Sequence, residues 1–195
     1  MRSRDVSAAL LCGISAAIVA AAHGDVTDGE AARSALGAVR RLVGEAHEAV
    51  VERHGARGPT FSIDNRWRVS VVSSTGDLPR LRDRMFGGSE HAQHRLQEPP
   101  GSSAIEAAAL ELVHRVFPDF DMGEFVLDAA KPKGEQARVE ARWRRVIPGS
   151  GFPGPGHCFV DFCWPDRAVH SMGAECPPIP DEWRRPATVA AERAE

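Results

Sequence analysis

The sequence lacks a strong excess of charge of either sign. Its 195 residues include 24 Lys or Arg and 27 Asp or Glu, which give a formal net charge of -3. Binding to nucleic acid needs a concentrated surplus of positive charge, so the composition argues against a nucleic-acid partner. A chain of this length buries about 70% of its unfolded surface, so its core needs neither a metal nor a disulfide. With 43% hydrophobic residues, the chain is typical of folded globular proteins.

The usual metal-binding spacings are also missing. The sequence has no C-x-x-C and no H-E-x-x-H motif. Soft metal ligands do occur at His157, Cys158, Cys163, His170 and Cys176, and at His91 and His94 beside Glu90. We interpret His91 and His94 as solvated side chains of a charged connector. In an exported protein, two of the cysteines are expected to form a disulfide and so to be lost as metal ligands. The sequence therefore predicts no metal and no cofactor.

Long apolar runs are absent except at the amino terminus. An uncharged, alanine-rich run from Val6 to Ala22 follows a start with two arginines, and small residues close it. This layout predicts a signal peptide over residues 1–22, cleaved after Ala22, and a secreted or periplasmic protein. An uncleaved anchor and a buried amphipathic helix remain open alternatives. No later stretch is apolar enough to span a membrane, so no stable span is expected after cleavage. Lysine is scarce beside arginine, which is typical of a GC-rich, bacterial genome.

Residues 23–101 are predicted to form a smaller helix-strand region. Apolar residues recur at three- and four-residue steps and predict a helix from Asp28 to His54. Odd-numbered apolar residues from Phe61 to Val71 then predict a strand, with a turn at Asp64-Asn65 as an option. The segment 75–101 is rich in charge and in Gly and Pro, and it reads as a connector with at most one short helix.

Residues 102–176 are predicted to form the main domain. An apolar stripe predicts a helix that starts near Ser103 and stops at Phe117-Pro118. Period-two patterns then predict strands in 123–130, 137–147, 157–164 and 168–172. The expected fold class is α+β, with one helix packed on a curved antiparallel four-stranded sheet in the order α-β-β-β-β and the other sheet face open. The tail, 177–195, is expected to be peripheral, and the first half to be at most a reduced copy of the second.

Residues 103–172 resemble PepSY-like domains, which occur in peptidase propeptides and in many exported bacterial proteins. The resemblance is carried by an alanine-rich helix ending at Pro118, Trp143 followed by Arg145, a glycine-bearing loop over 149–156, and a hairpin that presents Asp161. The chain departs from the family at Pro165-Asp166-Arg167, where a glycine is usual, and in its cysteines. The resemblance implies a binding or peptidase-modulating role without a catalytic centre. A cystatin-like or NTF2-like fold would give nearly the same pattern.

Removal of residues 1–22 would leave Cys158, Cys163 and Cys176, an odd number in an oxidising compartment. If residues 164 and 167 pair across the last hairpin, Cys158 lies opposite residue 173 and within reach of Cys176. We therefore predict a Cys158–Cys176 disulfide, with Cys163–Cys176 as the competing pair. Closing a loop of about 18 residues would stabilise the fold by roughly 3 kcal/mol.

The same hairpin register places Asp161 opposite His170, with Cys163 on the face of Asp161. A thiol next to an imidazole that a carboxylate orients is a nucleophile-base arrangement. A thiol- or metal-dependent secreted enzyme that uses Cys163, His170 and Asp161 is therefore the alternative function. A cross-strand ion pair beside a buried cysteine explains the same residues without catalysis, and no oxyanion-hole turn is recognisable near Cys163.

Arginines occupy the positions that alternate with the apolar residues of two strands. Arg138, Arg142 and Arg144 flank Trp143, and Arg66 and Arg68 flank Trp67. These arginines predict a basic stripe, either simply solvated or able to bind an anionic peptide or polysaccharide. The leading hypothesis is an exported, non-enzymatic module that binds a protein or peptide partner through an open sheet face, a groove or strand addition.

Overall fold

The protein is described by a computed structural model for residues 26–55, 58–71, 78–88, 90, 98–133 and 137–184. The proposed signal peptide, residues 1–22, lies outside these ranges, as do His91 and His94.

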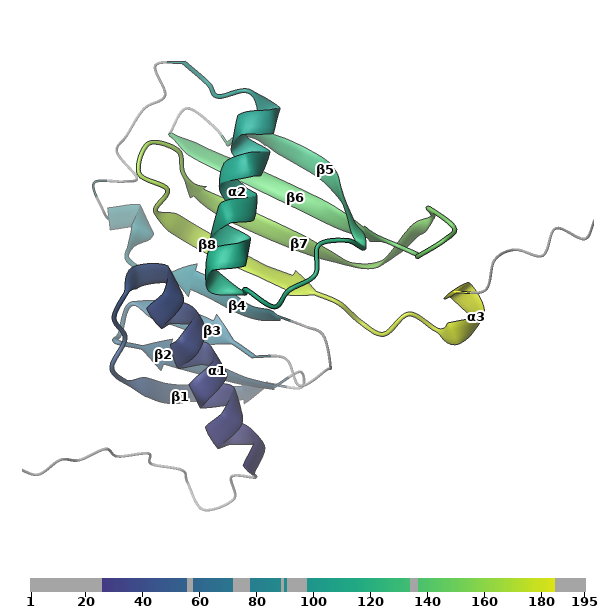
Figure 1. Cartoon of the computed structure of the whole chain (residues 1–195). Coiled ribbons are helices and arrows are strands. Elements are labelled where there is room, and N and C mark those ends of the chain that lie inside the picture. Colours follow the sequence, from purple (N-terminus) through teal and green to yellow (C-terminus); the bar gives the residue numbers. More distant parts are fainter. Residues whose placement is uncertain are drawn as a thin grey trace, which may run out of the picture.

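Within the described residues, the strands form one antiparallel sheet of eight strands in the order β1-β2-β3-β4-β8-β7-β6-β5. The strands are β1 Ala49–Gly55, β2 Gly58–Ile63, β3 Trp67–Ser70, β4 Leu78–Asp83, β5 Phe125–Pro132, β6 Arg138–Val146, β7 Pro153–Cys163 and β8 Val169–Glu175. The helices are α1 Val26–Val43, α2 Ser102–Val116, the short α3 Asp181–Arg184 and the 3-10 turn η1 Phe86–Gly88. Helices α1 and α2 lie side by side on the same face of the sheet (Figure 1).

The predicted fold class, one helix on a four-stranded sheet, was wrong. Residues 102–176 do contain a helix followed by four strands, but these strands form only half of a continuous eight-stranded sheet. The first half supplies the other half of the sheet, because it also consists of a helix followed by four strands. The structure is therefore mostly antiparallel sheet, with two long helices on one side.

The first half was mispredicted at two places. Helix α1 ends at Val43 instead of continuing to His54, because Gly44 adopts a left-handed conformation (φ 89°) and donates to the Arg40 carbonyl at 2.8 Å. The following residues are held away from a helical path, since the backbone amides of His47 and Glu48 donate to the Asp64 carboxylate. The predicted connector, 75–101, contains β4 and η1 among its described residues.

The two halves join where β4 pairs with β8. Glycine is needed at position 173 of this junction, because a Cβ there would lie 2.9 Å from the Arg80 Cγ and 3.3 Å from the Pro79 carbonyl oxygen. The junction pairs one outer strand of each half, so neither β4 nor β8 is an edge of the sheet.

The main hydrophobic core lies between the helices and the sheet and runs through both halves. The side chain of every second residue of most strands belongs to this core, for example Trp67 and Val69 on β3, and Val139, Ala141 and Trp143 on β6. Helix α2 contributes the predicted stripe of Ile105, Ala109, Leu112, Val113 and Val116, all of them buried. The alternate strand residues therefore point to the opposite face of the sheet.

Candidate binding surface on the open sheet face

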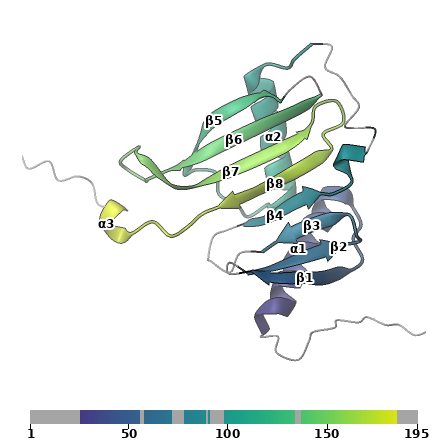
Figure 2. The same cartoon turned by 180° about the vertical axis from the view of Figure 1, so that it is seen from behind.

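The face of the sheet that points away from α1 and α2 is here called the open face. In the view from behind, the strands lie in front of both long helices (Figure 2). The short turn η1 reaches one corner of this face, where the Phe86 ring meets the His170 ring edge-on, with 4.8 Å between their centroids. The register of β6 places Arg138, Glu140, Arg142 and Arg144 on this face, because the residues between them belong to the core. Arg138, Arg142 and Arg144, three of the five arginines predicted to form a basic stripe, thus share one face. Arg66, another of the five, lies in the turn before β3 and pairs with Asp83 at 2.7 Å.

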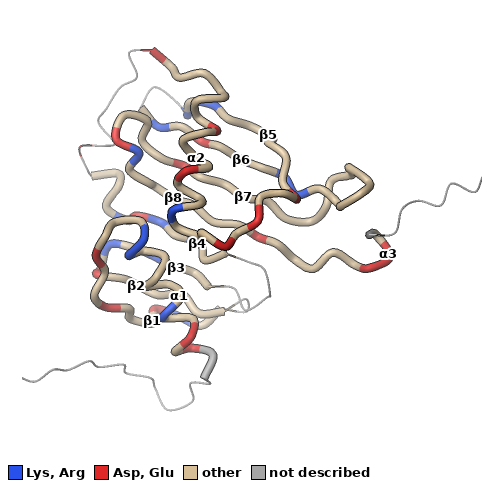
Figure 3. Tube along the Cα trace, in the orientation of Figure 1, with Lys and Arg blue, Asp and Glu red and all other residues tan. Residues whose placement is uncertain are grey.

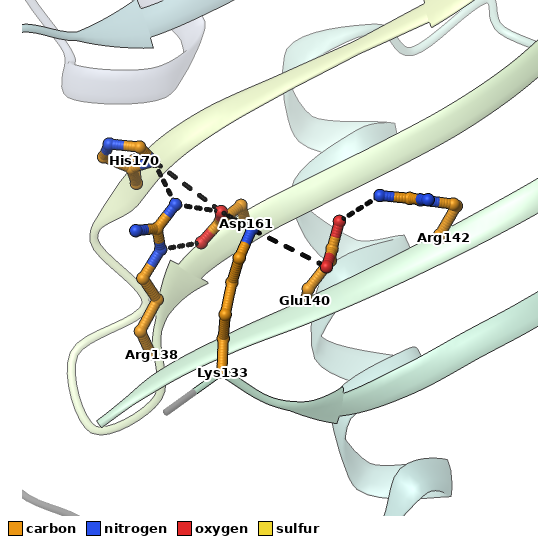
Figure 4. A network of polar contacts seen from close by, with 6 residues as sticks. All are labelled: Lys133, Arg138, Glu140, Arg142, Asp161 and His170. Carbon is orange, nitrogen blue, oxygen red and sulfur yellow. Dashed lines mark hydrogen bonds and ion pairs between the residues drawn. The ribbon is translucent and has the colours of Figure 1, made fainter. Parts of the chain in front are cut away.

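A network of ion pairs occupies the open face over β6, β7 and β8 (Figure 4). Asp161 lies at its centre with its side chain only 4% exposed. Arg138 donates to both of its carboxylate oxygens through Nε and Nη2, and the Lys133 Nζ lies 3.1 Å from Oδ2. Lys133 also reaches Glu140, which accepts a 2.7 Å hydrogen bond from Arg142. Hydrogen bonds and ion pairs therefore link two acidic and three basic side chains into one network.

Asp161 stays ionised in this setting. Burial by itself would raise the pKa of its carboxyl group, but the hydrogen bonds and positive charges of Arg138 and Lys133 hold that pKa well below its usual range. The carboxylate compensates the cations around it, so it serves the fold as a fixed negative charge.

His170 is brought to Asp161, as the sequence predicted, but by a different register. Asp161 pairs with Ser171, because a bulge between Asp161 and Phe162 shifts the hairpin. The His170 Nδ1 lies 3.7 Å from Asp161 and 2.8 Å from Arg138 Nη2. Arginine can only donate, so Nδ1 accepts and the imidazole carries its proton on Nε2. The Asp–His pair is thus oriented by Arg138.

Cys163 has surroundings that disfavour a nucleophile. The residue is fully buried and packs with Phe86, Ala137 and Ala168. Burial, together with the neighbouring Asp166 carboxylate, raises the pKa of its thiol to about 12. A catalytic thiol needs a cationic or imidazole partner that lowers the pKa. The arrangement therefore does not favour catalysis by Cys163, His170 and Asp161.

The Cys158–Cys176 disulfide stays a prediction. Cys158 pairs with Ala174 rather than residue 173, and both cysteines are buried on the core side of the sheet. Burial and the interaction with Cys176 raise the pKa of the Cys158 thiol to about 12. Within the described part of the chain the structure contains no disulfide.

Alkylation of the native protein tests these thiol environments. A pKa near 12 for Cys158 and Cys163 lowers the thiolate population about a thousandfold relative to an ordinary cysteine. We expect iodoacetamide to label both residues very slowly in the native protein and rapidly after reduction and unfolding in urea, as measured by peptide mass spectrometry. Rapid labelling of Cys163 in the native state would revive the thiol-enzyme alternative. The same spectra, recorded without reductant, show whether Cys158 and Cys176 are linked.

The centre of the open face carries an aromatic side chain between arginines. Phe159 on β7 is half-buried, and the Arg80 guanidinium lies 5.5 Å from its ring centroid. His157 stacks on the same ring at 6.0 Å. Arg142 on β6 and Gly173 on β8 are the cross-strand partners of Phe159. Because Gly173 has no side chain, Arg80 can reach across it to the ring.

Sequence reasoning missed several residues of this surface, notably Arg80, Arg82 and Phe159. Arg80 and Arg82 belong to β4, which lies inside the charged segment predicted to be a connector. The alternation of Pro79, Leu81 and Asp83, all buried, with the two arginines was a weak period-two signal. Their position on the open face follows only from the pairing of β4 with β8.

Other possible sites are less developed. A hollow of about 340 Å³ lies between α1 and the end of α2, but its cation Arg41 already donates to the Val116 carbonyl. Within the described residues, no cluster of His, Cys, Asp and Glu is arranged to hold a metal ion. The helices that the structure describes include none with both the length and the apolar character needed to cross a membrane.

Comparison of the chain with protein-family models, with curated proteins and with solved structures finds no match. The geometry of the open face is therefore the basis for assigning a function.

Proposed function

We propose that the protein is an exported, non-enzymatic module whose open sheet face binds a protein or peptide partner. The observation that carries this proposal is the placement of both long helices on one face of the sheet, which leaves a broad, ordered polar surface on the other. Export rests on the predicted signal peptide, residues 1–22. The resemblance of residues 103–172 to PepSY-like domains makes a peptidase one candidate for the partner.

The composition of the open face supports protein binding. Protein interfaces are enriched in arginine and aromatic residues, and their strongest contacts cluster near the centre of the interface. Phe159, with Arg80 above its ring and Arg142 beside it, has this composition and this position. The ion pairs around Asp161 hold neighbouring side chains in place, so a partner meets a surface that has less side-chain entropy to lose. Strand addition at β1 or β5, the edges of the sheet, is the other binding mode.

Affinity capture with matched variants tests the open face. The tagged full chain is expressed in its host and recovered from periplasm and medium with its bound proteins. We expect the wild-type chain and the control Arg33→Glu to retain the same partner, since Arg33 is exposed on α1. Phe159→Ala and Arg142→Glu should each reduce its recovery at least tenfold, because truncating a central interface residue costs more than about 2 kcal/mol. Equal recovery with all four chains would rule out binding through the open face.

A further inference from the structure

The acidic side chains of the open face are recessed beneath the basic ones. In the network on β6 and β7, Asp161 and Glu140 are 4% and 12% exposed, whereas Arg142 and Lys133 are 51% and 46% exposed. On the other half of the sheet, Glu52 is 22% exposed and pairs with Arg68, which is 47% exposed, and with Arg84. Arg80 is likewise more exposed than its partner Glu175. The outermost layer of the open face is therefore cationic.

Two arginines of this face lie opposite cationic or uncharged groups instead of acids. Arg82 is the cross-strand partner of Arg68, and Arg144 is the cross-strand partner of His157. Among the described residues neither Arg82 nor Arg144 forms an ion pair, and both are exposed. Like charges placed directly opposite in a sheet destabilise the pair, so an anionic partner at Arg82 would relieve its repulsion from Arg68.

The positive face contrasts with the whole chain, whose formal net charge is -3. Acidic residues gather elsewhere, for example on the loop between α2 and β5 at Asp119, Asp121 and Glu124 (Figure 3). The charge of the protein is thus separated between its surfaces. Such separation steers an oppositely charged partner toward one face and raises its association rate.

We propose that the partner is an acidic protein surface whose Asp and Glu side chains meet Arg82, Arg142 and Arg144. Phe159, the cross-strand partner of Arg142, accepts an apolar side chain of the partner. This inference rests on the proposed function, since it names the class of partner that the open face takes.

An acidic protein fits better than a nucleic acid or a sulfated polysaccharide. The recessed carboxylates of Asp161, Glu140 and Glu52 lie between the cations and would repel a continuous line of phosphates or sulfates. A protein surface can place its carboxylates at the arginines and other groups over the recessed acids. The overall negative charge also opposes binding to a polyanion.

Binding of the purified full chain to a labelled acidic peptide, in which Glu residues are separated by Ser, Gly and Phe, is measured by fluorescence anisotropy and tests the charge of the face. We expect the wild-type chain to bind this peptide more tightly than heparin, with an affinity that falls as salt rises through about 0.15 M. The double variant Arg142→Glu, Arg144→Glu should lose at least tenfold in affinity. The matched control Arg33→Glu, Arg115→Glu makes the same change of charge on exposed helix positions and should lose less than twofold. Circular dichroism confirms that both variants are folded.

The outcomes separate this inference from the proposed function. No binding to the acidic peptide, tighter binding to heparin, or equal losses in both double variants would overturn the acidic partner. If the partner recovered in the capture experiment depends on Phe159 but survives Arg142→Glu and high salt, the open face binds a partner of another chemistry. If its recovery depends on no open-face residue, the proposed function fails as well.

Discussion

Replacement of Asp161 by alanine is expected to lower the free energy of unfolding by about 3 kcal/mol. The Asp161 carboxylate is nearly buried and accepts hydrogen bonds from Arg138 and Lys133. Its removal leaves Arg138, whose side chain is 24% exposed, without the charge that compensates it. Urea unfolding of the two chains measures the difference.

Ser171→Ala provides the matched control, because Ser171 is the cross-strand partner of Asp161 on β8. We expect this change to stay within about 0.5 kcal/mol. If Asp161→Ala were as mild as Ser171→Ala, the network would not contribute to the fold.

The effect of Asp161 should depend on pH in a defined direction. Burial opposes ionisation, but the hydrogen bonds from Arg138 and Lys133 prevail and lower the pKa of Asp161 in the folded protein. The stabilisation is therefore complete above the unfolded-state pKa of about 3.9 and is lost as the pH falls through the lower, folded-state pKa. The difference between wild type and Asp161→Ala should be largest near neutral pH and shrink in acid. A difference that grows in acid would contradict the charge arrangement.

Trp143→Ala is expected to cost about 3–5 kcal/mol, the largest loss from a single core position. Trp143 is 2% exposed and lies on the core side of β6, where its Nε1 is 3.5 Å from Glu106 on α2. Removing the indole leaves a cavity between the sheet and this helix and takes away a hydrogen-bond donor. Thermal and urea unfolding measure the loss.

Trp183 allows the same substitution at an exposed site. Its side chain belongs to the short helix α3, and the residue is 47% exposed. Trp183→Ala should therefore change stability by less than about 0.5 kcal/mol. Equal losses at the two tryptophans would show that Trp143 is not an anchor of the core.

Folding and binding can be separated experimentally on this scaffold. Arg142 is 51% exposed, and its ion pair with Glu140 is worth at most about 1 kcal/mol in a solvated setting. A charge reversal at Arg142 therefore acts mainly on what approaches the open face. The Asp161 and Trp143 variants act on the scaffold beneath it.

Much of the second half could be predicted, because an element that buries only one side has apolar residues at regular intervals in its sequence. The alternation of Val139, Ala141 and Trp143 with arginines identified β6 and both of its faces. The stripe on α2 did the same for the helix. In each case the pattern lies within one element and needs no knowledge of its neighbours.

The first half was harder to predict, because the spacing of its apolar residues indicates a helix where the chain forms β1, and a connector where it forms β4. Helical spacing continues past Val43, but Gly44 ends the helix, and the backbone amides of His47 and Glu48 donate to the Asp64 carboxylate instead of to helical carbonyls. The charged residues of β4 are typical of a connector, and the strand that pairs with β4, β8, follows about 90 residues later in the chain. The bulge between Asp161 and Phe162 likewise shifted the predicted pairing by one residue.

The sequence by itself determined which side of each strong element is apolar, and so where Arg138, Arg142 and Arg144 lie relative to the core. Only the tertiary structure decided that β4 meets β8, which brings Arg80 over Phe159 and joins two half-sheets into one surface. The physical reason is that periodicity records the burial of an element's own residues. The choice of a neighbouring strand depends instead on backbone hydrogen bonds and close contacts, such as that at Gly173, between residues far apart in the chain.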